Sequence, residues 1–420
     1  MLSIAFRLLK LSFNKVMNAE IILGVIFLLQ SHEVPAWELS GYAGMESLGF
    51  FHEGIDNQQH NHYLSGVVQP QLVHEWDNGR QSFAFVPFYR LSQYDNRRTH
   101  FDIRELTWLK AADTWELRVG FRKVFWGVTE SQHLVDIVNQ SDLVENIDGE
   151  DKLGQPMVNL ALIRDWGTLD LFVLPGFRER TFSGPQGRFR FNPALDVHDS
   201  LYEKKGAERQ MAYAVRWSKA IGDWDWGLSQ FYGTNRDPSF LPTLDQSGKL
   251  HLTPYYESIF QTGLDVQVTK GSWLWKLESI VRSGQGKTYY AGTGGVEYTF
   301  YGILETSVDV GLIAEYMYDS RGQRTIHTLN QPNQLVILQD DFLAAVRLGF
   351  NDEQSTEILA GITFDRTTGE KIYNLEASRR LGENFKIELE VRLYNNAYFN
   401  NPAYFLQKDD SIRTELSYYF

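Results

Sequence analysis

The chain has 420 residues, of which 43% are hydrophobic and 14% aromatic, and its formal net charge is -13. Its mean hydropathy of -0.33 is too polar for a protein built from membrane-spanning helices, each of which needs about 20 consecutive apolar residues. The acidic charge, without a basic stripe, argues against nucleic acid as a partner. The absence of cysteine excludes a fold held by disulfides.

The first 36 residues have the pattern of a secretory signal peptide. A basic segment precedes a short apolar run at residues 21–29, and small residues follow it, with a cleavage position after Ala36. The run is too short to cross a bilayer as a helix. We therefore expect export through the general secretory pathway, a signal peptide at residues 1–36 and a single mature domain over residues 37–420.

From residue 37 onward, apolar and polar residues alternate. About 18 segments show this period of two, with lengths of roughly 9 to 11 residues that suit a tilted membrane-spanning strand. In one clear case Trp115 and Leu117 face one way and Arg118 faces the other. The pattern predicts an all-β fold, a transmembrane antiparallel β-barrel of about 18 strands. A count of 16 is possible, because the segments near 100–108 and 289–299 alternate poorly.

The connectors between these segments alternate in length. The short ones carry the Gly, Asn and Asp that tight hairpins need for positive φ, and they lie at residues 77–79, 111–114, 165–167, 222–223, 270–271, 302, 351–355 and 382–384. The longest lie at residues 127–154, 175–208, 234–253, 321–340 and 395–409. Outer-membrane barrels have short periplasmic turns and long extracellular loops, so we expect the same arrangement here.

The final segment, residues 411–420, places Ile412, Leu416 and Tyr418 on one face and ends in Phe420. This ending resembles the closing strand of Gram-negative outer-membrane β-barrels, in which a terminal phenylalanine is typical. The resemblance implies a location in the cell outer membrane, in contact with its lipid and lipopolysaccharide. It also implies that the barrel assembly machinery recognises the Phe420 strand.

Charged side chains on the face opposite the apolar one are predicted to line the lumen, because a cation at mid-depth on the lipid face costs about 2–4 kcal/mol. These pore-lining candidates are Arg118, Arg122, Arg216, Lys276, Glu278, Arg282, Glu315, Arg347, Glu376, Glu388, Glu390, Arg392, Arg413 and Glu415. Ladders of salt bridges between strands that fill the lumen are an alternative interpretation, and ladders can also line a polar channel.

Two long loops carry opposite charge and supply candidates for a constriction. One contains Asp136, Asp142, Glu145 and Asp148, and the other contains Arg178, Arg180, Arg188 and Arg190. Folded inward, these loops would place a transverse field across the lumen that orients and selects polar solutes. Alternatively, both are solvated surface loops, and the basic one contacts lipopolysaccharide phosphates.

A few residues near the first long loop are of types found in metal and catalytic sites. His60 and His62 form a His-x-His pair that could hold a divalent metal, and Asp56, His60 and Ser65 could contribute to a hydrolase at the rim. No nucleophile motif accompanies them, and solvated polar residues of a surface loop explain them better. We therefore predict no catalytic residue, no metal and no cofactor.

Residues 120–142 read GFRKVFWGVTESQHLVDIVNQSD and resemble a family of Gram-negative outer-membrane barrels of unassigned function. DUF1302-type barrels show a similar Trp-Gly followed by Asp-x-x-Asn-Pro-x-Asp. This chain has Asp136, Asn139 and Asp142 at the matching positions, with Gln140 in place of the proline. The resemblance implies a porin-like barrel and does not imply an activity.

These observations together predict a porin-like channel for passive diffusion of small polar or charged solutes, including anionic ones. Two alternatives stay open. One is a structural or adhesion barrel with a blocked lumen that acts through its extracellular loops, and the other is a hydrolase at the outer rim.

Overall fold

The computed structural model describes residues 37–191, 193–197, 199–204, 206, 209–244, 248–322, 332–395, 404 and 406–420. The predicted signal peptide lies outside the described residues. Among those that are described, no helix is long and apolar enough to cross a bilayer.

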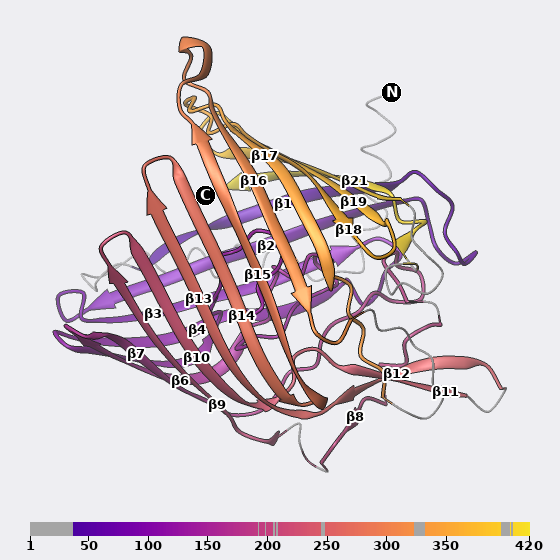
Figure 1. Ribbon diagram of the computed structural model, residues 1–420, viewed down its shortest axis with the longest axis horizontal. Coiled ribbons are helices and arrows are strands. Elements are labelled where there is room, and N and C mark those ends of the chain that lie inside the picture. The colour runs from indigo at the N-terminus through magenta and orange to yellow at the C-terminus, as the bar shows by residue number, and fades with distance from the viewer. Residues whose placement is uncertain are drawn as a thin grey trace. The chain divides into compact units, whose positions relative to one another are not determined.

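Eighteen strands form one antiparallel sheet that closes on itself (Figure 1). The first nine are β1 (Glu38–Phe50), β2 (His62–Trp76), β3 (Gln81–Ser92), β4 (His100–Ala112), β5 (Trp115–Arg122), β6 (Gln155–Arg164), β7 (Gly167–Leu174), β9 (Ala212–Ile221) and β10 (Trp224–Thr234). The other nine are β13 (Ser258–Lys270), β14 (Trp273–Gly284), β15 (Gly286–Phe300), β16 (Asp309–Asp319), β17 (Asp340–Gly349), β18 (Glu357–Asp365), β19 (Lys371–Leu381), β20 (Phe385–Asn395) and β21 (Ser411–Tyr419). Because β1 pairs with both β2 and β21, the sheet has no free edge.

The strand count of 18 is confirmed, and β4 shows why its segment alternates poorly in the sequence. Val86 pairs with Glu105 and Pro87 pairs with Ile103, so Arg104 is an extra residue without a partner on β3. This bulge lies opposite a proline, which has no N–H to give to the ladder. The bulge directs the Arg104 side chain inward, where it donates to Asp142.

The predicted connector pattern is also confirmed. All eight connectors predicted to be short join consecutive strands at one end of the barrel, called the short-turn end below. Asp77, Asn78 and Gly79 have φ of 57°, 54° and 78°, the left-handed conformation that these residue types tolerate best. At the opposite, long-loop end, three connectors are short as well, Gln285 between β14 and β15, residues 366–370 between β18 and β19, and residues 93–99 between β3 and β4.

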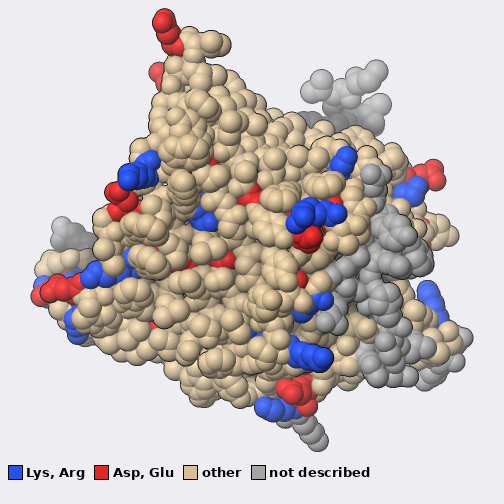
Figure 2. All heavy atoms as spheres, viewed as in Figure 1, with Lys and Arg blue, Asp and Glu red and all other residues tan. Residues whose placement is uncertain are grey.

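The outer face of the barrel is apolar. Large hydrophobic side chains on this face are exposed, among them Leu39, Met45, Leu64, Leu91, Val119, Leu171, Leu228, Leu277, Leu312, Phe342, Leu393 and Leu416. Figure 2 shows few Lys, Arg, Asp or Glu side chains over much of one such face. Exposed aromatic residues next to the short turns include Trp166, Trp224, Trp273, Tyr301 and Phe385. An apolar band with aromatic residues at its border is the surface that a membrane-spanning barrel presents to lipid.

The long connectors form a second, smaller sheet of three strands, β8 (Leu201–Tyr202), β11 (Ser239–Leu244) and β12 (Leu250–Tyr256). Phe182, Phe240 and Leu252 form a small apolar core beside it. The long-loop end is therefore packed by its own hydrophobic contacts.

A charge added to the outer face of the barrel should destabilise the protein more than one added to the inner face. Leu277→Arg places a cation on the lipid face of β14 and should lower the free energy of unfolding by about 2–4 kcal/mol. Leu359→Arg, on β18 between the inward residues Arg347 and Glu376, should change it by less than about 1 kcal/mol. Denaturant titration of the protein refolded in lipid vesicles checks both, and equal losses would contradict the assignment of faces.

Candidate functional site

The connector between β5 and β6, residues 123–154, is named here the lumenal loop. Its residues contact side chains of β4, β14, β16, β17 and β20, strands that lie all around the sheet. One loop can reach all of them only from inside the closed barrel. The lumenal loop therefore crosses the lumen.

One side of the lumenal loop packs against the barrel wall through apolar contacts. Trp126, Val135, Ile137 and Val138 are buried in a cluster with residues from the inner face of neighbouring strands. These wall residues are Met157, Phe172, Leu174, Ala212, Ala214, Phe231, Ile259, Ile280, Tyr289 and Ala291. The inner face was predicted to be charged, and this apolar part of the wall was not predicted from the sequence.

Two buried wall carboxylates bind the backbone of the lumenal loop. Glu278 on β14 is 0% exposed and accepts hydrogen bonds from the N–H groups of Val128, Thr129 and Val135 at 2.7, 3.0 and 3.1 Å. Glu315 on β16 accepts from the N–H groups of Glu130 and Ser131, both at 2.8 Å. A loop without regular secondary structure leaves its N–H groups unpaired, and these two carboxylates satisfy five of them.

Two further contacts fix the lumenal loop. The Glu130 carboxylate lies 2.8 Å from the guanidinium of Arg347 and 3.6 Å from the amine of Lys276. Arg236 is buried beyond the end of β10 and donates to the carbonyl oxygen of Val138 at 3.0 Å. No carboxylate pairs with Arg236 in the described part of the chain, and burial lowers its pKa to about 9.

The opposite side of the lumenal loop is held by ion pairs. Asp142 pairs with Arg104 at 2.7 Å, Glu145 with Arg90 at 2.7 Å and Asp148 with Arg392 at 2.8 Å. Burial disfavours ionisation of Asp142, but the hydrogen bond from His100 and the charge of Arg104 outweigh it and lower its pKa to about 2. Asp136, the remaining acidic candidate, pairs with Lys152 of the same loop at 3.1 Å.

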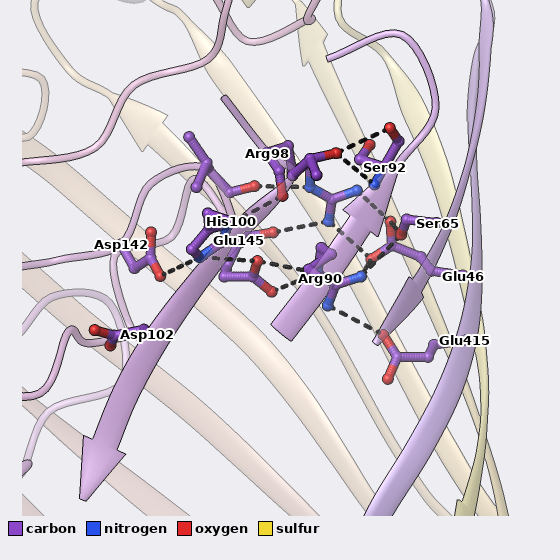
Figure 3. Close-up of polar contacts among 12 residues, drawn as sticks. Glu46, Ser65, Arg90, Ser92, Arg98, His100, Asp102, Asp142, Glu145 and Glu415 are labelled. Carbon is purple, nitrogen blue, oxygen red and sulfur yellow. Dashed lines mark hydrogen bonds and ion pairs between the residues drawn. The ribbon is translucent and has the colours of Figure 1, made fainter. Parts of the chain in front are cut away.

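A network centred on Glu46 of β1 continues from these pairs along the wall. Figure 3 shows Arg90 and Arg98 pointing toward the Glu46 carboxylate. Arg98 donates to Glu46 at 2.9 Å, Arg90 at 3.4 Å and Arg413 at 2.9 Å. Glu46 is 2% exposed, so its charge is balanced by guanidinium groups instead of water.

The basic candidates also have carboxylate partners. Arg178 pairs with Asp102 on β4, Arg180 with Asp237, Arg188 with Asp409 and Arg190 with Asp56. The two loops contact each other, since the Thr181 hydroxyl donates to Asp142 at 2.7 Å. The acidic and the basic candidates have partners other than one another, and a constriction formed by these loops stays a prediction.

The strand register places all fourteen pore-lining candidates on one face, the face that the lumenal loop contacts. Arg216 binds Asp265 through two contacts of 2.6 Å, Arg282 pairs with Asp237, and Arg118 pairs with Glu116. The others with charged partners are Lys276, Arg347, Glu388, Glu390, Arg392, Arg413 and Glu415. That these residues line an open pathway stays a prediction.

Arg122 differs from its neighbours, because its contact is with a neutral group. Its guanidinium donates to the side-chain oxygen of Asn159 at 2.9 Å. Glu376 accepts from the amide of Asn374 at 2.6 Å.

The residues considered for catalysis do not come together. Asp56 pairs with Arg190, and the Ser65 hydroxyl donates to Glu46. The His60 ring stacks on the Tyr94 ring, with 3.7 Å between the ring centres. His62 contacts the hydroxyl of Ser47 at 2.9 Å, but no carboxylate contacts His62 among the residues that the structure describes. A nucleophile, base and orienting acid are not assembled there.

One group of residues has metal-ligand types in close proximity within the described ranges, namely His100, Asp142 and Glu145. The imidazole lies 3.3 Å from Asp142 and 3.7 Å from Glu145. Both carboxylates are already neutralised by Arg104 and Arg90, so the group lacks the excess negative charge that a divalent cation needs.

Comparisons with known proteins give distant structural matches and no match in sequence. No protein-family model matches the sequence, and no curated protein is similar to it. Two variants of the porin of Rhodopseudomonas blastica, at 11% and 13% identity and a TM-score of 0.44, cover 92% of this chain and 100% of theirs. OmpT, an outer membrane protein of Vibrio cholerae, is 10% identical with a TM-score of 0.43 and covers 92% of this chain and 99% of its own. Similarity this low does not establish a function.

The closed sheet of 18 strands, its apolar outer face and its inward loop define the class. The chain is a transmembrane antiparallel β-barrel of 18 strands. The narrower resemblance to DUF1302-type barrels stays a prediction.

The Glu46 network predicts a large and local effect on stability. Glu46→Gln removes a buried negative charge and leaves Arg98, Arg90 and Arg413 without it, which should cost about 3–5 kcal/mol of unfolding free energy. Glu388→Gln, in which the carboxylate is 41% exposed and contacts Lys386, should cost less than about 1 kcal/mol. Guanidinium titration followed by tryptophan fluorescence measures both, and a Glu46 variant as stable as wild type would contradict this account.

Proposed function

We propose that the protein is a passive channel of the Gram-negative outer membrane for small polar or charged solutes, narrowed by the lumenal loop. The observation that carries this proposal is the fixed position of the lumenal loop inside a closed barrel, bound to both walls. In this proposal the short turns lie in the periplasm and the long loops outside. The pore-lining candidates then supply its charged walls.

The burial of inward side chains supports a passage along one side of the lumen. On β13 to β16 the inward Gln261, Glu278 and Glu315 are 0–2% exposed, because the lumenal loop covers them. On β17 and β20 the inward side chains of Arg347 and Glu388 are 38% and 41% exposed. In this proposal the passage runs beside Arg347 and Glu388 at the short-turn end of β17 and β20.

The long-loop end supports a second candidate. The apolar core of Phe182, Phe240 and Leu252 gives the loops an ordered surface of their own. A structural or adhesion barrel that acts through this surface would have no need of an open lumen.

Conductance separates the two candidates. The protein purified from outer membranes of an expressing bacterium should give discrete single-channel steps in a planar bilayer. A correctly folded barrel that gives no steps would overturn the channel proposal and favour the adhesion barrel.

Release of the lumenal loop should widen the channel. In Glu278→Gln an amide group replaces one oxygen that accepts loop N–H groups, so the loop loses part of its attachment. We expect larger and noisier single-channel conductance than in wild type. Asp113→Asn, the same chemical change at an exposed short turn, is the control and should leave the conductance unchanged. Unchanged conductance in both variants would show that the loop does not limit the passage.

Ion preference should depend on pH through the end of the lumenal loop. Burial and the neighbouring carboxylates of Glu145 and Asp148 raise the pKa of Asp151 to about 6. Deprotonation therefore adds a negative charge as pH rises from about 5 to about 7.5, and the reversal potential in a salt gradient should shift toward cation permeation. Asp151→Asn should reduce this shift. An identical shift in both proteins would exclude Asp151 as its source.

A further inference from the structure

A row of buried carboxylates at the long-loop end has no role in the channel proposal. Asp341 on β17 pairs in register with Asp365 on β18, so the two residues lie directly opposite each other on the inner face. Glu370 lies opposite Asp365 across the turn of residues 366–370, because the Asp365 N–H donates to the Glu370 carbonyl oxygen. Asp341, Asp365 and Glu370, named here the carboxylate row, are 3%, 3% and 4% exposed.

The charge of the carboxylate row is not balanced in the way that is usual in this barrel. Other buried carboxylates, such as Asp142 and Asp265, pair with an arginine. No Lys, Arg or His side chain forms an ion pair with Asp341 or Asp365 within the described residues, where both accept hydrogen bonds from N–H groups. Like charges directly opposite each other on neighbouring strands destabilise a sheet.

The two cations of the adjacent turn face away from the carboxylate row. The Arg366 guanidinium pairs with Asp340 and lies 5.8 Å from the centre of the Phe342 ring, on the outer face. Lys371 pairs in register with Phe364, which is also exposed on the outer face. Neither cation therefore neutralises the inner side of the turn.

Gln339 adds a neutral oxygen to the carboxylate row. Its backbone N–H donates to the Asp341 carboxylate at 2.7 Å, and its side-chain NH₂ group donates to the Asp365 carboxylate at 2.8 Å. The side-chain oxygen of Gln339 is buried, and no hydrogen-bond donor reaches it in the part of the chain that the structure describes. A buried polar atom without a partner is costly, and a bound cation would remove that cost.

The negative charge is also visible in the ionisation of Glu370. Burial and the charges of Asp365 and Asp341 raise the pKa of this carboxyl to about 7. The carboxylate row thus resists carrying three negative charges together. Either a proton or a bound cation can reduce the repulsion.

The ligand types and their spacing favour calcium among the cations. All four groups offer oxygen and none offers nitrogen or sulfur, which suits a hard cation. The three carboxylates do not all lie within 4.8 Å of one another, as the ligand atoms of His100, Asp142 and Glu145 do. Opposite ligands of calcium are about 5 Å apart and those of magnesium about 4 Å, so the wider arrangement favours calcium.

We propose that Asp341, Asp365, Glu370 and the side-chain oxygen of Gln339 bind a calcium ion. The ion joins the connector that ends at Gln339 to the turn between β18 and β19, and it supplies the positive charge that the arginines supply elsewhere. The proposal goes beyond the channel function and does not depend on it.

Isothermal titration of the mature protein tests the proposal. The protein is refolded in detergent without lipopolysaccharide, whose phosphates also bind divalent cations, and is freed of metal with a chelator. Calcium chloride should bind at one site with a Kd of about 10⁻⁴–10⁻³ M, and magnesium chloride should bind at least about tenfold more weakly. No saturable heat with calcium would overturn the site and leave a proton on Glu370 as the neutralising group. Equal affinities for the two ions would overturn the assignment to calcium.

A matched pair of variants locates the site. Asp365→Asn should weaken calcium binding at least about tenfold, because it removes a charged ligand from the carboxylate row. Asp340→Asn makes the same change in a residue paired with Arg366, and its calcium affinity should stay within about twofold of wild type. Equal losses in both variants, or unchanged binding in Asp365→Asn, would overturn the location.

The stability of the same variant separates a lost ligand from a damaged fold. Without calcium, Asp365→Asn should unfold at a guanidinium concentration no lower than wild type, because one of the opposed like charges is gone. Saturating calcium should raise the unfolding midpoint of wild type and of Asp340→Asn and leave that of Asp365→Asn unchanged. A calcium-dependent rise of equal size in all three proteins would contradict the site. The titrations of the unmodified protein test the proposal even if Asp365→Asn does not fold.

Discussion

The interior of a closed barrel imposes one requirement on everything placed inside it, which is that polar groups must find partners there. The lumenal loop has no regular secondary structure to pair its own N–H groups, so the wall must supply the acceptors. Glu278 on β14 and Glu315 on β16 supply these acceptors, and together they accept five backbone hydrogen bonds. A charged acceptor forms a stronger hydrogen bond than a neutral one, which makes this contact the anchor for the rest of the lumen.

The lumenal loop is bound to its two walls by different physical forces. On one side, Val135 and Val138 are completely buried against apolar strand residues, a contact that salt does not screen. On the other side, Glu145 and Asp148 are held by arginine side chains, and such pairs are strong only where water is excluded. The loop is therefore held on one side by contacts that salt does not weaken and on the other by contacts that depend on the exclusion of water.

The strands and turns could be predicted from the sequence because each depends on residues close together in the chain, and closure could be predicted because a membrane-spanning sheet must pair both of its edges. The alternation of apolar and polar residues that marks a strand is visible in consecutive residues. A turn such as Asp77-Asn78-Gly79 is specified by the conformational preferences of its own three residues. The inward direction of Arg104 could not be predicted, because it results from a bulge opposite Pro87 on another strand. The apolar wall was missed for a related reason. An isolated Phe231 or Ile280 on a polar face has no meaning until several strands are aligned, although the repetition of such residues on consecutive strands was a usable signal.

Ion pairing among the charged side chains inside the barrel determines how much net charge the lumen presents. Of the eight loop candidates for a constriction, seven pair with a residue outside their own loop, and Asp136 pairs within it. A charge that is neutralised by a fixed partner a few ångströms away contributes little field at the distance of a passing solute. A count of charged residues therefore overstates the electrostatic field in this lumen, which depends on how far each charge is compensated by its partner.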